Sequence, residues 1–137
     1  MNKLIYVLAI IFSFYSCSKD NDKYPQKWQL VRMTGQISNS AVTGKDMSWQ
    51  EYYLFMPNNI FVKHRERNGV ITEITGRFKS EKGSDATFLH LEYDAPSIII
   101  GSCYGNETEE LWFRTDDLLI NTWSACDGPG LEYERGN

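Results

Sequence analysis

The chain has 137 residues and a formal net charge of −4 at pH 7, and aromatic residues make up 14% of it. That length is typical of a single domain, so one hydrophobic core is expected. Proteins that bind nucleic acids rely on a basic surface, so the acidic balance argues against a nucleic-acid partner. The aromatic content, beside only 4 Pro and 10 Gly, excludes a disordered chain.

Residues 1–16 are predicted to form a signal peptide. Asn2 and Lys3 give a short positive start, and Leu4 to Phe14 form an apolar run. That run fits the apolar core of a signal peptide and is shorter than the roughly 20 residues that span a bilayer. A short N-terminal membrane anchor is the alternative.

The end of this run, Phe14-Tyr15-Ser16-Cys17, resembles a bacterial lipobox. A lipobox is cut before its Cys, whose sulfur takes diacylglycerol and whose new N-terminus receives a fatty acid such as palmitate. The next residues, 18–22, resemble the Lys-plus-acidic tag of surface lipoproteins in Bacteroidota-type bacteria. The resemblance implies an outer-membrane or cell-surface protein anchored through Cys17. The alternative is an ordinary signal peptide in which Cys17 is incidental.

Residues 17–26 are predicted to be the lipidated Cys and a polar tether, and residues 27–137 the folded domain. The tether shows no hydrophobic periodicity, whereas the domain shows short alternating segments bounded by turn residues. Strands are expected at residues 27–33, 49–56, 60–67, 70–79, 87–93, 98–100, 108–114, 118–123 and 131–135. The apolar phase of the first strand slips between Leu30 and Val31, which predicts a bend or bulge.

Asn68-Gly69 is the strongest turn signal, typical of a two-residue hairpin. It predicts that Arg67 pairs with Val70 and Lys63 with Ile74, and that His64 faces Glu73. Arg65 then pairs with Thr72, and Phe61 with Gly76. Lys63 and Arg65 would share a face with Phe61, which leaves two alternatives. Either they point into the interior and hold an anionic head group, or this part of the hairpin projects into solvent.

The pattern predicts an all-β fold of eight to nine short strands in an antiparallel meander, either an up-and-down barrel or a sandwich. After Trp49 no connection is expected to exceed about seven residues, which favours the barrel. The opening Lys-Trp-x-Leu (27–30) and the closing Cys-Asp-Gly-Pro-x-x-x-Tyr-x-Arg (126–135) resemble lipocalin-like small lipoproteins. The resemblance implies a barrel that binds a small apolar or amphipathic ligand.

With Cys17 assigned to lipid, Cys103 and Cys126 remain as an even pair in an oxidising compartment, and we expect a disulfide. Two free thiols or an incomplete metal pair are the alternatives.

Trp28, Phe55 and Phe78 are candidates to line a ligand cavity. The alternative is a solid core, because an eight-stranded barrel is barely wider than its own side chains.

No catalytic motif, metal cluster or cofactor motif is recognised, so a non-enzymatic protein is expected. The leading hypothesis is an envelope protein that binds a small ligand. The alternative is an interaction module with a solid core, an accessory subunit or inhibitor that docks on another envelope protein through loops such as 35–46 and 127–130.

Overall fold

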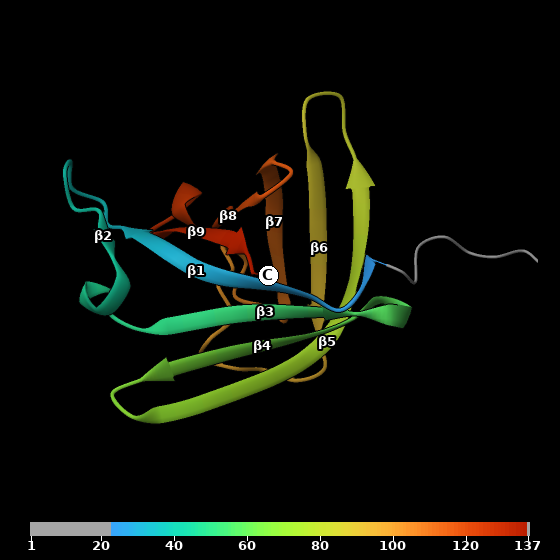
Figure 1. Ribbon diagram of the computed structural model, residues 1–137, viewed down its shortest axis with the longest axis horizontal. Helices are drawn as coiled ribbons and strands as arrows, with labels where there is room; N and C mark the ends of the chain where they lie inside the picture. Colours follow the sequence, from blue (N-terminus) through green and yellow to red (C-terminus); the bar gives the residue numbers. More distant parts are fainter. Residues whose placement is uncertain (1–22, 137) are drawn as a thin grey trace, which may run out of the picture.

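The computed structural model describes residues 23–136 (Figure 1). Within this part of the chain the long elements are all strands, and the helical elements are 3₁₀ turns. None of its helices has the length and apolarity needed to cross a membrane. The signal peptide and Cys17 lie outside the described residues, so the expectations for them stay predictions.

Nine strands follow one another between residues 23 and 136. They are β1 (Gln26–Thr34), β2 (Val42–Thr43), β3 (Gln50–Met56), β4 (Ile60–Arg67), β5 (Val70–Lys82), β6 (Thr87–Tyr93), β7 (Thr108–Thr115), β8 (Leu118–Asn121) and β9 (Gly130–Arg135). The 3₁₀ turns between them are η2 (Gly44–Asp46), η3 (Pro57–Asn59) and η4 (Trp123–Ala125). Most of the expected strands are confirmed, and β2 is a short addition to them.

The sheet closes on itself. Its strand order is β2-β1-β3-β4-β5-β6-β7-β8-β9, and β1 also pairs antiparallel with β9. Eight antiparallel strands therefore form an up-and-down barrel, with β2 added beside β1 (Figure 1). The predicted all-β barrel is confirmed over the sandwich, and closure pairs the edges that an open sheet would expose.

The β4–β5 hairpin has the predicted register. Arg67 pairs with Val70, Arg65 with Thr72 and Lys63 with Ile74. Asn68 and Gly69 have φ angles of 54° and 79°, as a two-residue hairpin turn requires. Because alternate residues face the same side of a strand, Lys63 and Arg65 share the inner face with Phe61.

The expected bulge in β1 is also present. The pairing of β1 with β9 shifts between Leu30 and Arg32. As a result Trp28, Leu30 and Met33 are all buried, although strict alternation would turn Met33 outward.

The expected strand at residues 98–100 and the expected short connections are wrong. Residues 94–107 form one long connection between β6 and β7. Ile100 N–H donates to the Ser97 carbonyl at 3.3 Å in a tight turn. Ile98 is 91% exposed there and Ile99 only 2% exposed. The apolar run therefore inserts one side chain into the barrel instead of pairing as a strand.

The two ends of the barrel differ in loop length (Figure 1). The long-loop end is defined by the connections 35–49, 68–69, 94–107 and 122–129. The short-turn end is defined by the connections 57–59, 83–86 and 116–117. The first strand begins with Gln26 at the short-turn end, and the last finishes there with Arg135. The chain therefore enters and leaves the barrel at the end opposite its long loops.

Candidate functional site

Two carboxylates and two cations meet inside the barrel, toward the long-loop end. Glu51 comes from β3, Lys63 and Arg65 from β4, and Glu109 from β7. Their exposed fractions are 0% for Glu51 and Lys63, 4% for Glu109 and 7% for Arg65. Lys63 Nζ lies 3.0 Å from both Glu109 carboxylate oxygens and 3.5 Å from Glu51 Oε1. Arg65 Nε donates to Glu51 Oε2. The four charges balance, as burial of ions requires.

Tyrosines complete this ion network. Tyr93 Oη donates to Glu109, and Tyr133 Oη donates to Glu51. Burial raises the pKa of Tyr53, Tyr93 and Tyr133 well above its usual value, and the nearby Glu51 and Glu109 charges raise it further. The three phenols therefore stay neutral, and Tyr93 and Tyr133 keep the proton that they donate.

The loop 94–107 covers the ion network with its own backbone. The Ile99 carbonyl accepts a hydrogen bond from Arg65 Nη2 at 3.3 Å, and Gly101 N–H donates to Glu109 Oε1 at 3.2 Å. A Cβ on Gly101 would lie 2.7 Å from Glu109 Oε1 and 2.8 Å from the Trp123 ring, so only glycine permits this approach. The loop thus occupies the positions where a ligand of Arg65 and Glu109 would bind.

The structure decides between the two alternatives for Lys63 and Arg65. The solvent-exposed alternative is wrong, because both side chains are buried. Their partners Glu51 and Glu109 were missed. A signal was present, since Glu51 is in phase with Tyr53 and Phe55 on the inner face of β3. Contact of Lys63 and Arg65 with a ligand stays a prediction.

The three aromatic residues that were candidates to line a ligand cavity lie in the core, where they contact other side chains of the barrel. Trp28, Phe55 and Phe78 are at most 6% exposed. The ring centroids of Phe55 and Phe78 are 4.9 Å apart, and the Arg135 guanidinium lies 5.1 Å from the Trp28 ring. Phe61 and Tyr133 are fully buried in the same core. Aromatic side chains therefore fill the space around the barrel axis below the ion network.

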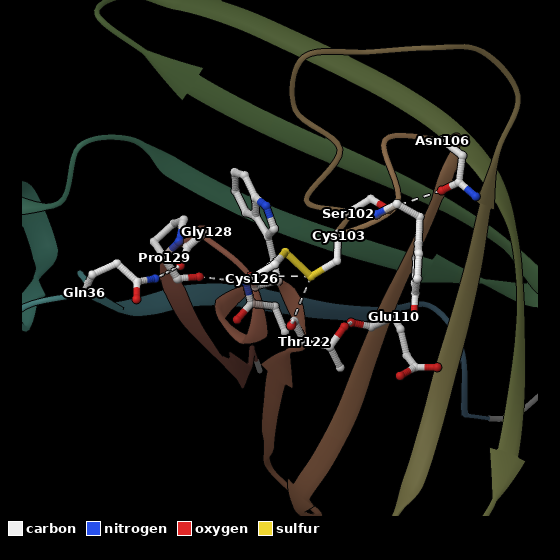
Figure 2. Close-up of a disulfide and its surroundings, with 12 residues drawn as sticks. Gln36, Ser102, Cys103, Asn106, Glu110, Thr122, Cys126, Gly128 and Pro129 are labelled. Atoms are coloured by element: carbon white, nitrogen blue, oxygen red, sulfur yellow. Dashed lines mark hydrogen bonds between the residues drawn. A yellow bond between two sulfur atoms is a disulfide. The ribbon is translucent and has the colours of Figure 1, made fainter.

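The predicted disulfide between Cys103 and Cys126 is confirmed, with an S–S distance of 2.09 Å (Figure 2). It joins the loop 94–107 to the loop 122–129. Gln36 Nε2 donates to the Gly128 carbonyl at 2.6 Å, which attaches the connection 35–49 to the same place (Figure 2). Three of the four connections at the long-loop end are thus linked to one another.

A groove of about 660 Å³ lies on the outer wall of the barrel, beside the loop 94–107. Residues of β5, β6 and β7 form its floor, both exposed ones such as Arg77 and Lys79 and the buried Phe78, Leu91 and Glu109, and residues 101–104 form one side. Its lining residues are Arg77, Phe78, Lys79, Glu81, His90, Leu91, Glu92, Gly101, Ser102, Cys103, Tyr104, Thr108, Glu109, Glu110, Thr122 and Ala125. This volume is within the 300–1,000 Å³ range typical of small-molecule sites.

Some of the charged side chains on the groove floor form ion pairs, and others form none. His90 lies between two carboxylates, with Nδ1 3.0 Å from Glu110 Oε2 and Nε2 3.3 Å from Glu81 Oε2. Arg77 and Lys79 are exposed and form no ion pair with any residue from 23 to 136. The groove therefore presents two cations, Arg77 and Lys79, and one carboxylate, Glu92, that form no ion pair within residues 23–136 and are open to a ligand.

No group of three His, Cys, Asp or Glu side chains between residues 23 and 136 is arranged to hold a metal ion. The predicted facing of His64 and Glu73 is confirmed, with Nδ1 3.3 Å from Oε1. His64 also stacks on Tyr52, with the ring centroids 4.6 Å apart. His64 therefore takes part in an ordinary cross-strand contact.

Comparison with protein-family models, with curated proteins and with solved structures found no match. The class of the protein is therefore defined by its own fold and site. It is a closed antiparallel up-and-down β-barrel with a charge-balanced ion network inside and a groove on its outer wall.

Proposed function

We propose that the protein is a lipid-anchored, non-enzymatic binding protein of the bacterial envelope, and that it takes a small amphipathic molecule in the outer groove. The observation that carries this proposal is the groove itself, with its volume of about 660 Å³. Arg77 and Lys79 offer unpaired cations, while the Tyr104 ring and Ala125 offer apolar contact. A ligand with a polar head and an apolar body matches that combination.

The groove suits a ligand better than the interior does. Lys63 and Arg65 are already paired with carboxylates, and the loop backbone covers them. An interior ligand would have to expel Ile99 and separate buried charges, which costs several kcal/mol unless the ligand replaces every contact. The outer groove requires no such exchange.

The proposed lipid anchor and the proposed non-enzymatic role are supported by different observations. The lipobox-like residues ending at Cys17 support lipidation, and the short tether implies action close to the membrane. The non-enzymatic proposal is supported by the surroundings of the two histidines, which contact Glu73 in one case and Glu81 and Glu110 in the other. Neither arrangement resembles a nucleophile with its base.

Native mass spectrometry of the domain purified from its own host tests the ligand proposal. Thr108→Trp places an indole in the groove, and Thr115→Trp makes the same change elsewhere on β7. Each threonine contributes one exposed hydrogen bond, so the two variants are matched. We expect a small molecule to remain bound to the wild type and Thr115→Trp and to be lost from Thr108→Trp. A wild type without bound molecule, or equal retention in all three proteins, would contradict the proposal.

A further inference from the structure

In the part of the chain that the structure describes, large apolar side chains are exposed at only one end of the barrel. Among residues 23–136 they are Ile37, Val70, Ile71, Ile98 and Tyr104, and they are between 62% and 91% exposed. All five belong to the long-loop end: Ile37 to the connection 35–49, Val70 and Ile71 to the start of β5 beside the 68–69 turn, and Ile98 and Tyr104 to the loop 94–107. Exposed apolar side chains on neighbouring connections can together contribute to an interaction surface.

The backbone beside these side chains is fixed. Gln36, next to Ile37, donates to the Gly128 carbonyl at 2.6 Å. Ile99, next to Ile98, is buried, and its carbonyl is held by Arg65. Cys103, next to Tyr104, is in the disulfide. A surface held in this way loses little conformational entropy on binding, so more of its contact energy becomes affinity.

The charges at this end select the kind of partner. Asp46, Asp94, Glu107 and Asp127 lie exposed in the three long connections, where the only base is Lys45. The hairpin adds Glu66 and Arg67, which balance each other. This acidic rim disfavours anionic lipid and disfavours a second copy meeting end to end, because like charges opposite each other cost energy. A protein whose face carries both apolar and basic side chains complements it.

We infer that the long-loop end is a docking surface for a partner protein whose face is apolar and basic. The inference goes beyond ligand binding in the groove, because Ile71 and Ile98 do not line that groove. The chain enters the barrel at the opposite end, so residues 23–26 do not cover the docking surface (Figure 1).

Site-specific photo-crosslinking in the native host is the first test. A photoreactive residue replaces Ile71 or Ile98, and Ser84 in the 83–86 turn serves as the control at the short-turn end. We expect both long-loop positions, and not the control, to form an adduct of one mass with the same protein. Adducts with lipid or with a second copy of this chain, or no shared adduct, would overturn the inference.

Binding of the purified partner to the mature domain is the second test. We expect Ile71→Asp and Ile98→Asp to weaken the affinity at least tenfold and Ser84→Asp to leave it unchanged, while added salt weakens it progressively. Affinities that are unchanged by the Ile variants or by salt would overturn the inference. Ile71 and Ile98 do not line the groove, so their variants test the docking surface separately from the groove.

Discussion

Lys63 is a charged residue with no exposed surface, held between Glu51 and Glu109. Removing one member of a buried ion network leaves its partners charged and unpaired. We expect Lys63→Met to lower the free energy of unfolding by roughly 3–5 kcal/mol. Urea denaturation of the mature domain measures it.

Lys79→Met is the matched control, because Lys79 is exposed and makes no ion pair with residues 23–136. Its unfolding is expected to stay close to that of the wild type. Adding Glu109→Gln to Lys63→Met removes the uncompensated charge and is expected to recover part of the loss. Equal stability of the two single variants would contradict a structural role of the ion network.

Because three tyrosines are buried, we expect the stability of the folded domain to fall at alkaline pH. The folded state raises the pKa of Tyr53, Tyr93 and Tyr133 above the usual value of about 10, so above that pH the unfolded chain releases phenol protons that the folded chain retains. Their contribution to stability is complete below about pH 10 and is lost as the pH rises further.

Tyrosinate absorbance followed against pH checks this expectation. We expect a fraction of the phenols to ionise only together with unfolding, as circular dichroism reports it. Tyr133→Phe should reduce the amplitude of that late step. Ionisation of all tyrosines in one step while the fold is intact would contradict the prediction.

The residues of the ion network show how far sequence reasoning reaches. The inward direction of Lys63 and Arg65 followed from the Asn68-Gly69 turn, because a two-residue hairpin fixes its register locally. Glu109 as a partner did not follow, because β7 comes opposite β4 only through closure of the barrel. Distant pairing of this kind depends on tertiary structure, which local patterns do not contain.

Among the elements between residues 23 and 136, β5 is the longest strand, and its Gly76 pairs with Phe61 of β4 and Tyr93 of β6. A Cβ at this position would lie 2.2 Å from the Glu92 carbonyl oxygen and 2.7 Å from the Phe61 ring. We expect Gly76→Ala to destabilise the domain by about 1–3 kcal/mol, because neither neighbour can move without disturbing the barrel wall.

Gly130→Ala in β9 is the control, because its Cβ would meet its nearest atom at an ordinary 3.6 Å. Thermal unfolding of both variants measures the difference. A Gly76→Ala variant as stable as Gly130→Ala would show that β5 tolerates a side chain at this position.

The disulfide that holds the loop 94–107 leads to a prediction: reducing it lowers the stability of the domain. The disulfide spans a sequence separation of 23, and opening it releases conformational freedom in the unfolded chain worth roughly 3 kcal/mol. We expect reductant to lower the urea midpoint of the domain and the variant Cys103→Ser/Cys126→Ser to match the reduced protein. A urea midpoint that is the same with and without reductant would contradict this expectation.

The same loop explains the one misplaced strand. Three consecutive isoleucines have high strand propensity, so residues 98–100 resemble a buried strand. Their actual conformation is set by Arg65 bound to the Ile99 carbonyl and by Gly101 against Glu109. These contacts come from distant strands, and they override the local preference.

At the scale of the molecule, the meander was predictable because most of its turns are short and each joins neighbouring strands. The sequence allowed us to predict that the barrel closes, but not which residues of β1 pair with which residues of β9. The groove was not predictable, because it depends on where a misassigned loop lies beside β7.

The anchor is also a property of the whole molecule. We expect Cys17→Ala to move the protein from the membrane fraction to the soluble fraction and to abolish labelling by a palmitate analogue, because several acyl chains are needed for stable attachment. Cys103→Ser is expected to retain both the label and the membrane fraction. Labelling that persists in Cys17→Ala would contradict lipidation at that residue.

The contacts of Ile99 and Gly101 inside the barrel have a consequence for any molecule that competes for that space. The segment 97–101 is a tethered competitor, and a short tether gives it an effective concentration on the order of 1 mM. A free ligand present at about 1 µM would need an intrinsic affinity roughly a thousandfold higher to reach equal occupancy. Only a ligand of high affinity can therefore displace the segment 97–101 from the interior. Ligands of lower affinity can bind only on the outer surfaces of the barrel.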